Sequence, residues 1–314
     1  MGDLRDDEAD YDEFAFLQGH AEWAGLPWTG RPMVRRRSVA VAPGQRLSMI
    51  AWGEGDPELV FLHGGGQNAH TWDTVAMAIG RPAIAVDLPG HGHSSWRDDR
   101  DYWPWSNAEA VAVAVAEVAP HAAGVVGMSL GGLTTIRLAA AHPELVPRAV
   151  VVDVTPGVMT QFVGLTTEQR GSVAVVGGAP VFDTFDDMLA NLHSTMPNRP
   201  IESLRPGLRH NARQLDDGKW TWIHDLSPRD TPEDAGPRAA PESFEPLWDD
   251  LASIRQPILL VKGGASMFVH PDDLGRFTET APQGRSEVVD GASHAVQSDH
   301  PVELATLIEK FLKT

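Results

Sequence analysis

Short apolar runs, each ending in a polar or glycine-rich turn, recur along most of the chain. Ala149–Val152, for example, is followed at once by Asp153. Runs this short and continuously apolar are typical of strands that are buried on both faces of a parallel sheet. We predict six such strands, over residues 59–62, 83–86, 124–126, 149–152, 258–261 and 286–289.

Segments with the apolar spacing of helices lie between several of these runs. They cover residues 71–79, 105–118, 130–141, 272–280 and 301–312. Two earlier strands, over residues 34–41 and 47–52, are joined by a turn at Pro43-Gly44. The alternation of strands and helices predicts an α/β fold with a doubly wound, mostly parallel sheet.

The alternation stops after Asp153 and resumes near Ile258. Residues 156–245 contain helical patterns without clear strand runs, and Pro, Arg and Asp crowd the stretch from Ser227 to Pro241. We therefore predict a helical cap inserted over the carboxyl edge of the sheet. The α/β core then consists of residues 31–155 and 246–314, and residues 1–30 form an acidic extension whose later aromatic residues pack on the core.

Charge and composition exclude several classes of function. Acidic residues outnumber basic ones by 43 to 25, and the formal net charge is −18, so a nucleic-acid surface is disfavoured. Arg35-Arg36-Arg37 is the one dense basic run, and we interpret it as the solvated edge of an early strand. The chain has no cysteine, which excludes disulfides and thiolate chemistry.

Hydropathy gives no indication of a membrane or secretory segment. Residues 1–30 lack the apolar core of a signal peptide, and no run of about 18 apolar residues occurs. We expect a cytoplasmic protein that contacts neither membrane nor nucleic acid. A homodimer is compatible with the sequence.

The segment Gly127-Met128-Ser129-Leu130-Gly131 carries the strongest chemical signal. It follows a predicted strand and opens a predicted helix, which is the context that the G-x-S-x-G motif requires. The flanking glycines allow the tight turn that exposes the serine hydroxyl at the positive end of the helix. We predict that Ser129 is a nucleophile.

A glycine-rich turn, His63-Gly64-Gly65-Gly66, ends an earlier strand. A serine hydrolase stabilises the oxyanion of its tetrahedral intermediate with about two preorganised donors. We predict that the backbone N–H groups of Gly65 and Leu130 supply them. We expect His63 to brace this loop rather than to transfer protons.

His294 lies in Gly291-Ala292-Ser293-His294, between the last predicted strand and the last predicted helix. Thirteen histidines occur, but only this one has that position. We predict that His294 is the general base. The other histidines beyond His63 are taken as surface or structural residues.

These motifs together resemble those of the α/β-hydrolase superfamily. The matching stretches include the turn at His63-Gly64, the loop from Asp87 to Ser94, the serine turn and the His294 loop, and they span residues 59–312. The resemblance implies a serine hydrolase that needs no metal or organic cofactor. In the family the Asp87–Ser94 loop is structural, so we assign it no catalytic role.

The third member of the triad departs from the usual family pattern. Most members carry an acid three residues beyond a glycine after the penultimate strand, where this chain has Ser266. A subset, which includes mycotoxin lactone hydrolases, carries it after the strand that follows the nucleophile, and Asp153 occupies that position. We favour Asp153 and keep Asp272 or Asp273, and the absence of a protein acid, as alternatives.

The substrate is expected to be a small hydrophobic ester or lactone. The residues that we expect to contact it are Met128, Gly64, Met159, Leu192 and Trp222. The cap residues among them have a competing interpretation, in which they hold the cap together. Three other functions stay open: cleavage of carbon–carbon bonds in ring-fission products, cofactor-free perhydrolase or oxygenase chemistry, and a ligand receptor on a hydrolase fold.

Overall fold

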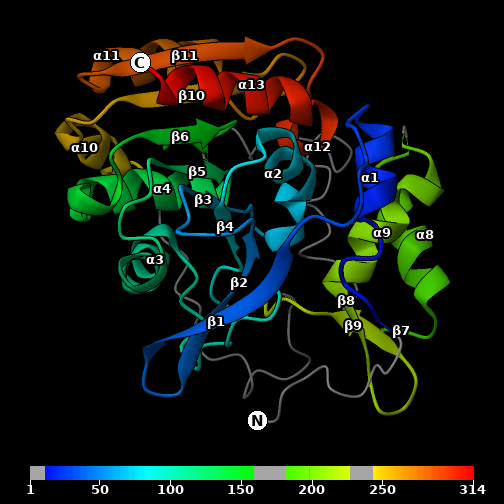
Figure 1. Cartoon of the computed structure of the whole chain (residues 1–314). Helices are drawn as coiled ribbons and strands as arrows, with labels where there is room; N and C mark the ends of the chain where they lie inside the picture. Colours follow the sequence, from blue (N-terminus) through cyan, green and yellow to red (C-terminus); the bar gives the residue numbers. More distant parts are fainter. Residues whose placement is uncertain (1–10, 159–180, 198, 227–242) are drawn as a thin grey trace.

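An eight-stranded sheet lies at the centre of the computed structural model, which describes residues 11–158, 181–197, 199–226 and 243–314 (Figure 1). Its strands are β1 (Val34–Ala42), β2 (Gln45–Trp52), β3 (Leu59–Leu62), β4 (Ala83–Val86), β5 (Gly124–Met128), β6 (Ala149–Val152), β10 (Ile258–Gly263) and β11 (Gly284–Val289). They are arranged in the order β1-β2-β4-β3-β5-β6-β10-β11. The first two pairings are antiparallel and the others are parallel, so the predicted doubly wound, mostly parallel sheet is confirmed.

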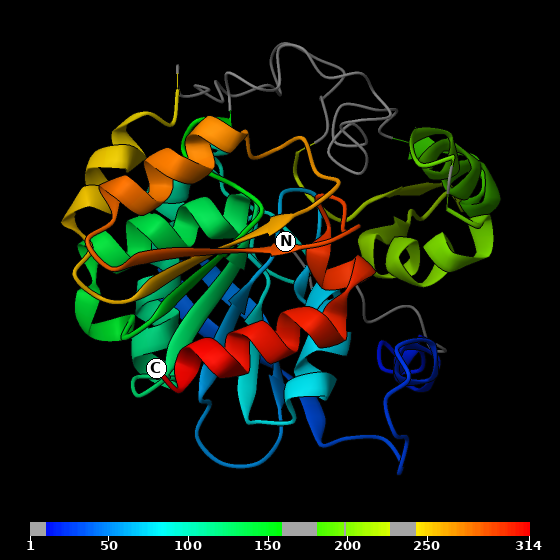
Figure 2. The same cartoon turned by 90° about the horizontal axis from the view of Figure 1, so that it is seen from above.

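Helices cover both faces of this sheet. One core cluster is built with α3 (Pro104–Val118), α4 (Leu130–Ala141), α10 (Pro246–Ser253) and α11 (Pro271–Thr280). The other is built with α1 (Leu17–Trp23), α2 (Asp73–Ile79), α12 (Val296–Asp299) and α13 (Pro301–Leu312). Figure 2 shows α13 on one side of the sheet and α4, α10 and α11 on the other. Two short 3-10 helices, η1 (Ala69–Trp72) and η2 (Pro143–Leu145), complete the core.

The strand register places three functional segments at one edge of the sheet. Val152 is paired with Met128 on one side and with Val261 on the other. Because these strands are parallel, the residues after them emerge at the same edge, where α/β sheets bind their ligands. Ser129, Asp153 and the end of β10 are therefore neighbours although Ser129 and Gly263 are 134 positions apart in the chain.

The inserted cap contains more than the expected helices. Helices α8 (Phe185–Thr195) and α9 (Ile201–Asn211) pack against an antiparallel sheet in the order β7-β9-β8. These strands are β7 (Val181–Phe182), β8 (Ala212–Gln214) and β9 (Trp220–Trp222). Strands of two or three residues are too short to give a period-two pattern, which is why the prediction of a purely helical cap was incomplete.

The N-terminal arm, residues 11–30, is attached to the core through a buried network of charges. The Arg36 guanidinium on β1 donates to Glu13 of the arm and, at 2.7 Å, to the carboxylate of Asp87. Glu13 also accepts from Nε2 of His70, whose Nδ1 lies 2.8 Å from Asp73. The interpretation of the arginine run as a solvated edge was thus wrong for Arg36, because it could not anticipate a partner twenty-three residues away.

This network extends to the segment that follows the glycine-rich turn. Asp87 is fully buried, and its second oxygen accepts from the backbone N–H of Ala69 in η1 (2.7 Å). Although burial disfavours its charge, Arg36 and neighbouring histidines lower the pKa of Asp87 to about 2. The carboxylate is therefore ionised and fixes the residues just beyond the turn at His63.

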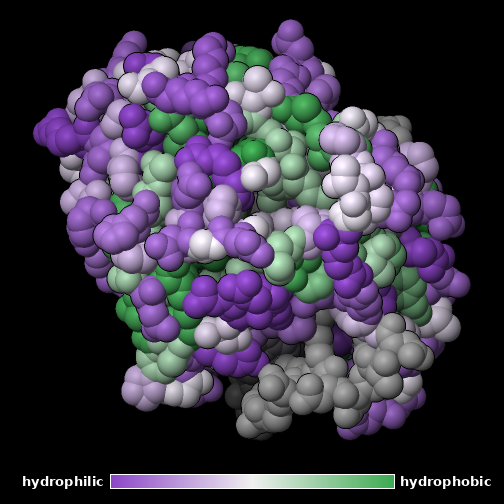
Figure 3. Space-filling model, in the orientation of Figure 1, coloured by the Kyte–Doolittle hydropathy of each residue, from purple (hydrophilic) through white to green (hydrophobic). Residues whose placement is uncertain are grey.

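The outer surface agrees with the acidic composition. Hydrophilic residues cover much of the face in Figure 3, with apolar residues in small groups between them. Within the described parts of the chain, no helix is long and apolar enough to cross a membrane.

The protonation of His70 leads to a prediction about how stability depends on pH. Burial opposes its charge, but the carboxylates of Asp73 and Glu13 raise the pKa of His70 to about 9, from an ordinary value of 6.5. A raised pKa adds stability that is complete below pH 6.5 and is lost as the pH rises through 9. Denaturant unfolding should show the free energy of unfolding falling by up to about 3 kcal/mol over this range. His70→Gln should be less stable at pH 6.5 and should lose most of this pH dependence; an unchanged slope in the variant would contradict the assignment.

Candidate active site

Ser129 occupies a strained turn between β5 and α4. Its backbone has φ 51° and ψ −117°, which non-glycine residues rarely adopt. Glycines make the turn feasible: a Cβ on Gly127 would lie 2.1 Å from the Gly131 carbonyl oxygen, and one on Gly131 would lie 2.2 Å from that of Leu62. The turn is held by the Ser129 N–H, which donates to the carbonyl of Val152 (3.1 Å). The serine thus stands at the N-terminus of α4, as the motif predicts.

The glycine-rich turn lies directly beside this serine. A Cβ on Gly64 would lie 3.3 Å from the Ser129 Cβ, so the two backbones approach closely. The Gly64 N–H donates to Oε1 of Gln67 (3.1 Å), and the Gly66 N–H donates to Nε2 of His91 (3.1 Å). The N–H between them, that of Gly65, has no acceptor among the described residues, and neither does that of Leu130 at the start of α4.

Two buried histidines fix the shape of this turn. His63 Nδ1 donates to the Gly64 carbonyl (2.7 Å), and its Nε2 accepts from the Leu88 N–H (2.9 Å). His91 Nδ1 donates to the Pro89 carbonyl (2.9 Å), and its Nε2 accepts from the Gly66 N–H. Burial lowers the pKa of His63 and holds that of His91 well below its usual range, so both rings are neutral and can accept as well as donate. The bracing expected of His63 agrees with this geometry. His91 was taken by default as a surface or structural residue, and its contact with Gly66 was not predicted.

Asp153 and His294 form a hydrogen-bonded pair. Asp153 directly follows β6, with φ 51°, and is fully buried, and its Oδ2 lies 2.8 Å from His294 Nδ1. The other oxygen, Oδ1, accepts from the backbone N–H of Gly263 (2.9 Å). Ser266, at the position where most of the superfamily carries the acid, donates its hydroxyl to Oδ2. A carboxylate with these donors orients the imidazole with its proton on Nδ1.

The alternative acids lie elsewhere. The Asp272 side chain is 93% exposed at the start of α11 and lies 3.4 Å from His270 Nδ1. The carboxylate of Asp273 lies beside Gly157, where an added Cβ would come within 2.7 Å of it. The hydrogen bond of His294 goes to Asp153 rather than to either of them.

The far nitrogen of His294 has no hydrogen-bond partner among the described residues. Nε2 is buried, and the hydrogen bond to Ser129 that a serine–histidine pair would make is not formed. Such bonds often form only when substrate is bound. The loop is linked to the cap, because Asp299 accepts from the Ser293 N–H (2.8 Å) and is ion-paired with Arg199.

The predicted substrate contacts have different surroundings. Gly64 borders the serine, and Met128 lies beneath it, 1% exposed, within the core cluster of α2 and α13. Leu192 and Trp222 belong to the same buried hydrophobic cluster inside the cap. This agrees with the competing interpretation, in which they hold the cap together. Met159 lies outside the described residues. A role of these side chains in substrate binding stays a prediction.

One group of side chains has the composition of a metal site. Ligand atoms of His70, Asp73 and His210 lie within 4.8 Å of one another, and all three residues are buried. The rings of His70 and His210, however, are stacked, with centroids 3.8 Å apart and planes inclined by 12°. A metal ion must lie near the plane of each ring that binds it, and nearly parallel planes do not meet at such a point. Both nitrogens of His70 also face carboxylates, so this group fits an ion-pair network rather than a metal.

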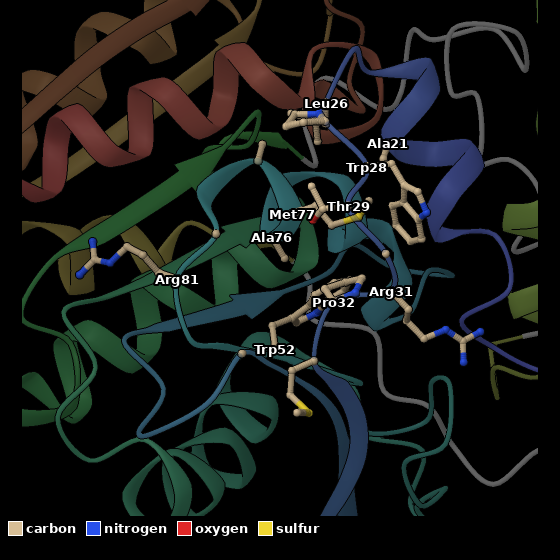
Figure 4. Close-up of a pocket in the computed structure, with 16 residues that line it drawn as sticks. Ala21, Leu26, Trp28, Thr29, Arg31, Pro32, Trp52, Ala76, Met77 and Arg81 are labelled. Atoms are coloured by element: carbon tan, nitrogen blue, oxygen red, sulfur yellow. The ribbon is translucent and has the colours of Figure 1, made fainter.

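A hollow of about 400 Å³ lies between the arm and α2, away from Ser129 (Figure 4). Trp28, Trp52 and Met77 give it a largely apolar lining. Its two charged lining residues already have partners: Arg31 is paired with Asp12, and Arg81 with Glu58 and Glu309. None of Ser129, Asp153 and His294 lines this hollow, so it is separate from the candidate site.

Comparison with known proteins identifies the family to which this fold belongs. Residues 59–307 match the alpha/beta hydrolase family. An esterase of Mycobacterium tuberculosis is 45% identical over 313 residues, which are 99% of each chain. Superposition on the crystal structure of this esterase gives a TM-score of 0.83 at 42% identity and covers 97% of this chain and 99% of the esterase. The pimeloyl-[acyl-carrier protein] methyl ester esterase of Aeromonas hydrophila is 30% identical over 274 residues, 85% of this chain and 99% of its own. The chain belongs to the alpha/beta hydrolase family.

The tightness of the serine turn can be tested by adding single methyl groups. Gly131→Ala would drive a Cβ into the carbonyl oxygens of Leu62 and His63, so α4 must shift. We expect the free energy of unfolding, measured in urea, to fall by about 2 kcal/mol. Gly275→Ala in α11 is the matched control, because nothing lies within 4 Å of its added Cβ, and it should gain about 0.5 kcal/mol. Equal stability of the two variants would refute this account of the turn.

Proposed function

We propose that this chain is a serine hydrolase that cleaves carboxylic esters through an acyl-enzyme intermediate. The observation that carries the proposal is the Asp153–His294 pair beside the strained serine turn. The pair orients an imidazole with a free Nε2, and the turn presents a hydroxyl next to two unused backbone donors. The esterases among the relatives support ester hydrolysis as the reaction.

The reaction follows from these positions. Nε2 of His294 takes the proton of the Ser129 hydroxyl as its oxygen attacks the ester carbonyl. The N–H groups of Gly65 and Leu130 hold the oxyanion that forms. His294 then gives its proton to the leaving alcohol, and water attacks the acyl-enzyme by the same steps in reverse. Asp153 stabilises the imidazolium that exists between these transfers.

We propose a hydrophobic acyl or alcohol group in the substrate. The described cap contains a cluster of apolar and aromatic side chains that includes Leu192 and Trp222, and the buried side chain of Met128 directly precedes the serine. Esters take precedence over lactones because two of the relatives hydrolyse esters by name, whereas the lactone expectation rested on the placement of the acid alone. Turnover of a panel of aryl esters of increasing acyl length, with small and macrocyclic lactones beside them, defines the preferred class.

Covalent labelling tests the nucleophile. A fluorescent alkyl phosphonate should modify the wild-type protein at one residue, and peptide mass spectrometry should locate it at Ser129. Ser129→Ala should abolish both labelling and ester turnover, while Ser95→Ala should leave them unchanged. Labelling elsewhere, or none, would contradict a serine hydrolase, and labelling without ester turnover would favour a carbon–carbon bond hydrolase or a receptor.

Substitution of the two candidate acids tests the third member of the triad. Asp153→Asn keeps the side-chain shape but no longer stabilises the imidazolium, so kcat should fall by about 10³ to 10⁴. Asp272→Asn, at an exposed site beside His270, should change kcat by less than about twofold. Loss of activity in the second variant and not in the first would show that Asp153 is not the acid.

A further inference from the structure

The segment after β10 touches the Asp153–His294 pair at two points. The Ser266 hydroxyl donates to Oδ2 of Asp153, which is the same oxygen that accepts from His294 Nδ1. Two residues later, the ring of Phe268 lies parallel to the imidazole of His294, with 3.6 Å between centroids and 11° between planes. One short loop therefore contacts both members of the pair.

A hydrogen bond within this loop determines where the hydroxyl hydrogen of Ser266 points. The backbone N–H of Phe268 donates to the Ser266 hydroxyl oxygen (3.1 Å), so the hydroxyl hydrogen is left to point at Asp153. Phe268 is 1% exposed, while Met267 between the two is 54% exposed. The loop thus turns Ser266 and Phe268 inward and the intervening side chain outward.

The strand behind the loop is fixed against the histidine loop as well. A Cβ on Gly263 would lie 2.3 Å from the carbonyl oxygen of Ser293, the residue before His294. The Gly263 N–H donates to the oxygen of Asp153 that His294 does not use. The loop and its strand end therefore hold both oxygens of the carboxylate.

We propose that Ser266 and Phe268 are positioning residues for ester hydrolysis, which prevent the carboxylate of Asp153 and the imidazole of His294 from rotating out of line. The inference rests on the proposed triad and adds two residues that act through it. Without the hydroxyl, the carboxylate loses a charge-assisted hydrogen bond on the oxygen that faces His294. Without the aromatic ring, the imidazole can turn about its side-chain bond, and the imidazolium loses a π face that favours positive charge.

Kinetics of paired variants separate positioning from general stability. Ser266→Ala and Phe268→Leu should each lower kcat about tenfold and change KM by less than about twofold, because they affect a group that is charged in the transition state. Ser266→Thr keeps the hydroxyl and Phe268→Tyr keeps the ring, so both should retain at least about half of kcat. All rates are divided by the fraction of protein that reacts with the phosphonate, which removes any contribution from misfolded protein.

Two control variants test the loop and the core. Met267→Ala shortens the outward side chain of the same loop, and Phe277→Leu makes the same ring-to-aliphatic change in α11, at a fully buried position. Both should keep kcat within about twofold, and Phe277→Leu should lower the unfolding temperature. If Phe277→Leu lowers kcat as much as Phe268→Leu does, the positioning of His294 by Phe268 is refuted.

A double-mutant cycle shows whether Ser266 acts through the acid. In an Asp153→Asn background, Ser266→Ala should cost less than about twofold in kcat, because its charged partner is already gone. The same tenfold loss in both backgrounds would overturn the proposal while leaving the triad intact. An Asp153→Asn variant with undiminished kcat would instead refute the acid assignment under the proposed function.

Discussion

A carboxylate that is completely removed from water determines the architecture of this site. Burying such a charge costs several kcal/mol unless hydrogen-bond donors replace the lost hydration. Asp153 has three: the N–H of Gly263, the hydroxyl of Ser266 and Nδ1 of His294. These donors come from the end of β10, from the loop that follows it and from the loop after β11. The carboxylate therefore has its full set of hydrogen bonds only when β10 is in register with both β6 and β11. The backbone of Asp153, with φ 51°, is held in place by the same three hydrogen bonds.

The second structural constraint is the junction of arm, core and cap. The imidazole of His70 in η1 is stacked on that of His210 in α9, and Tyr11 of the arm contacts the latter. Asn68, just before η1, donates to the carbonyl of His210 (2.8 Å) and to the side chain of Asn211 (2.9 Å). The cap is therefore attached close to the glycine-rich turn, and the arm covers the attachment. The cap thus contacts the segment after the glycine-rich turn and, through Arg199 and Asp299, the His294 loop.

Much of this could be predicted from the sequence, because parallel strands bring their carboxyl ends to one edge. The apolar runs determined the strands, and the residues after them, Ser129, Asp153 and His294, were then expected to be neighbours. Asp153 was identifiable only because Ser266 stood at the usual acid position. The contacts of Ser266 and Phe268 could not be predicted, since they depend on how one loop turns in space. The partners of Arg36 and the three-stranded cap sheet were missed because long-range pairing leaves no local periodicity.

The meeting of two strand ends at one histidine also bears on how such a site can evolve. A chain with carboxylates at both positions 153 and 266 would place two acids on a single hydrogen bond, where only one can be ionised near neutral pH. The other, protonated, could donate its hydrogen as the Ser266 hydroxyl does here. An ancestor with two acids would therefore keep its histidine oriented throughout, and either acid could later be lost. In this chain the charge lies at position 153 and the hydrogen-bond donor opposite it at position 266.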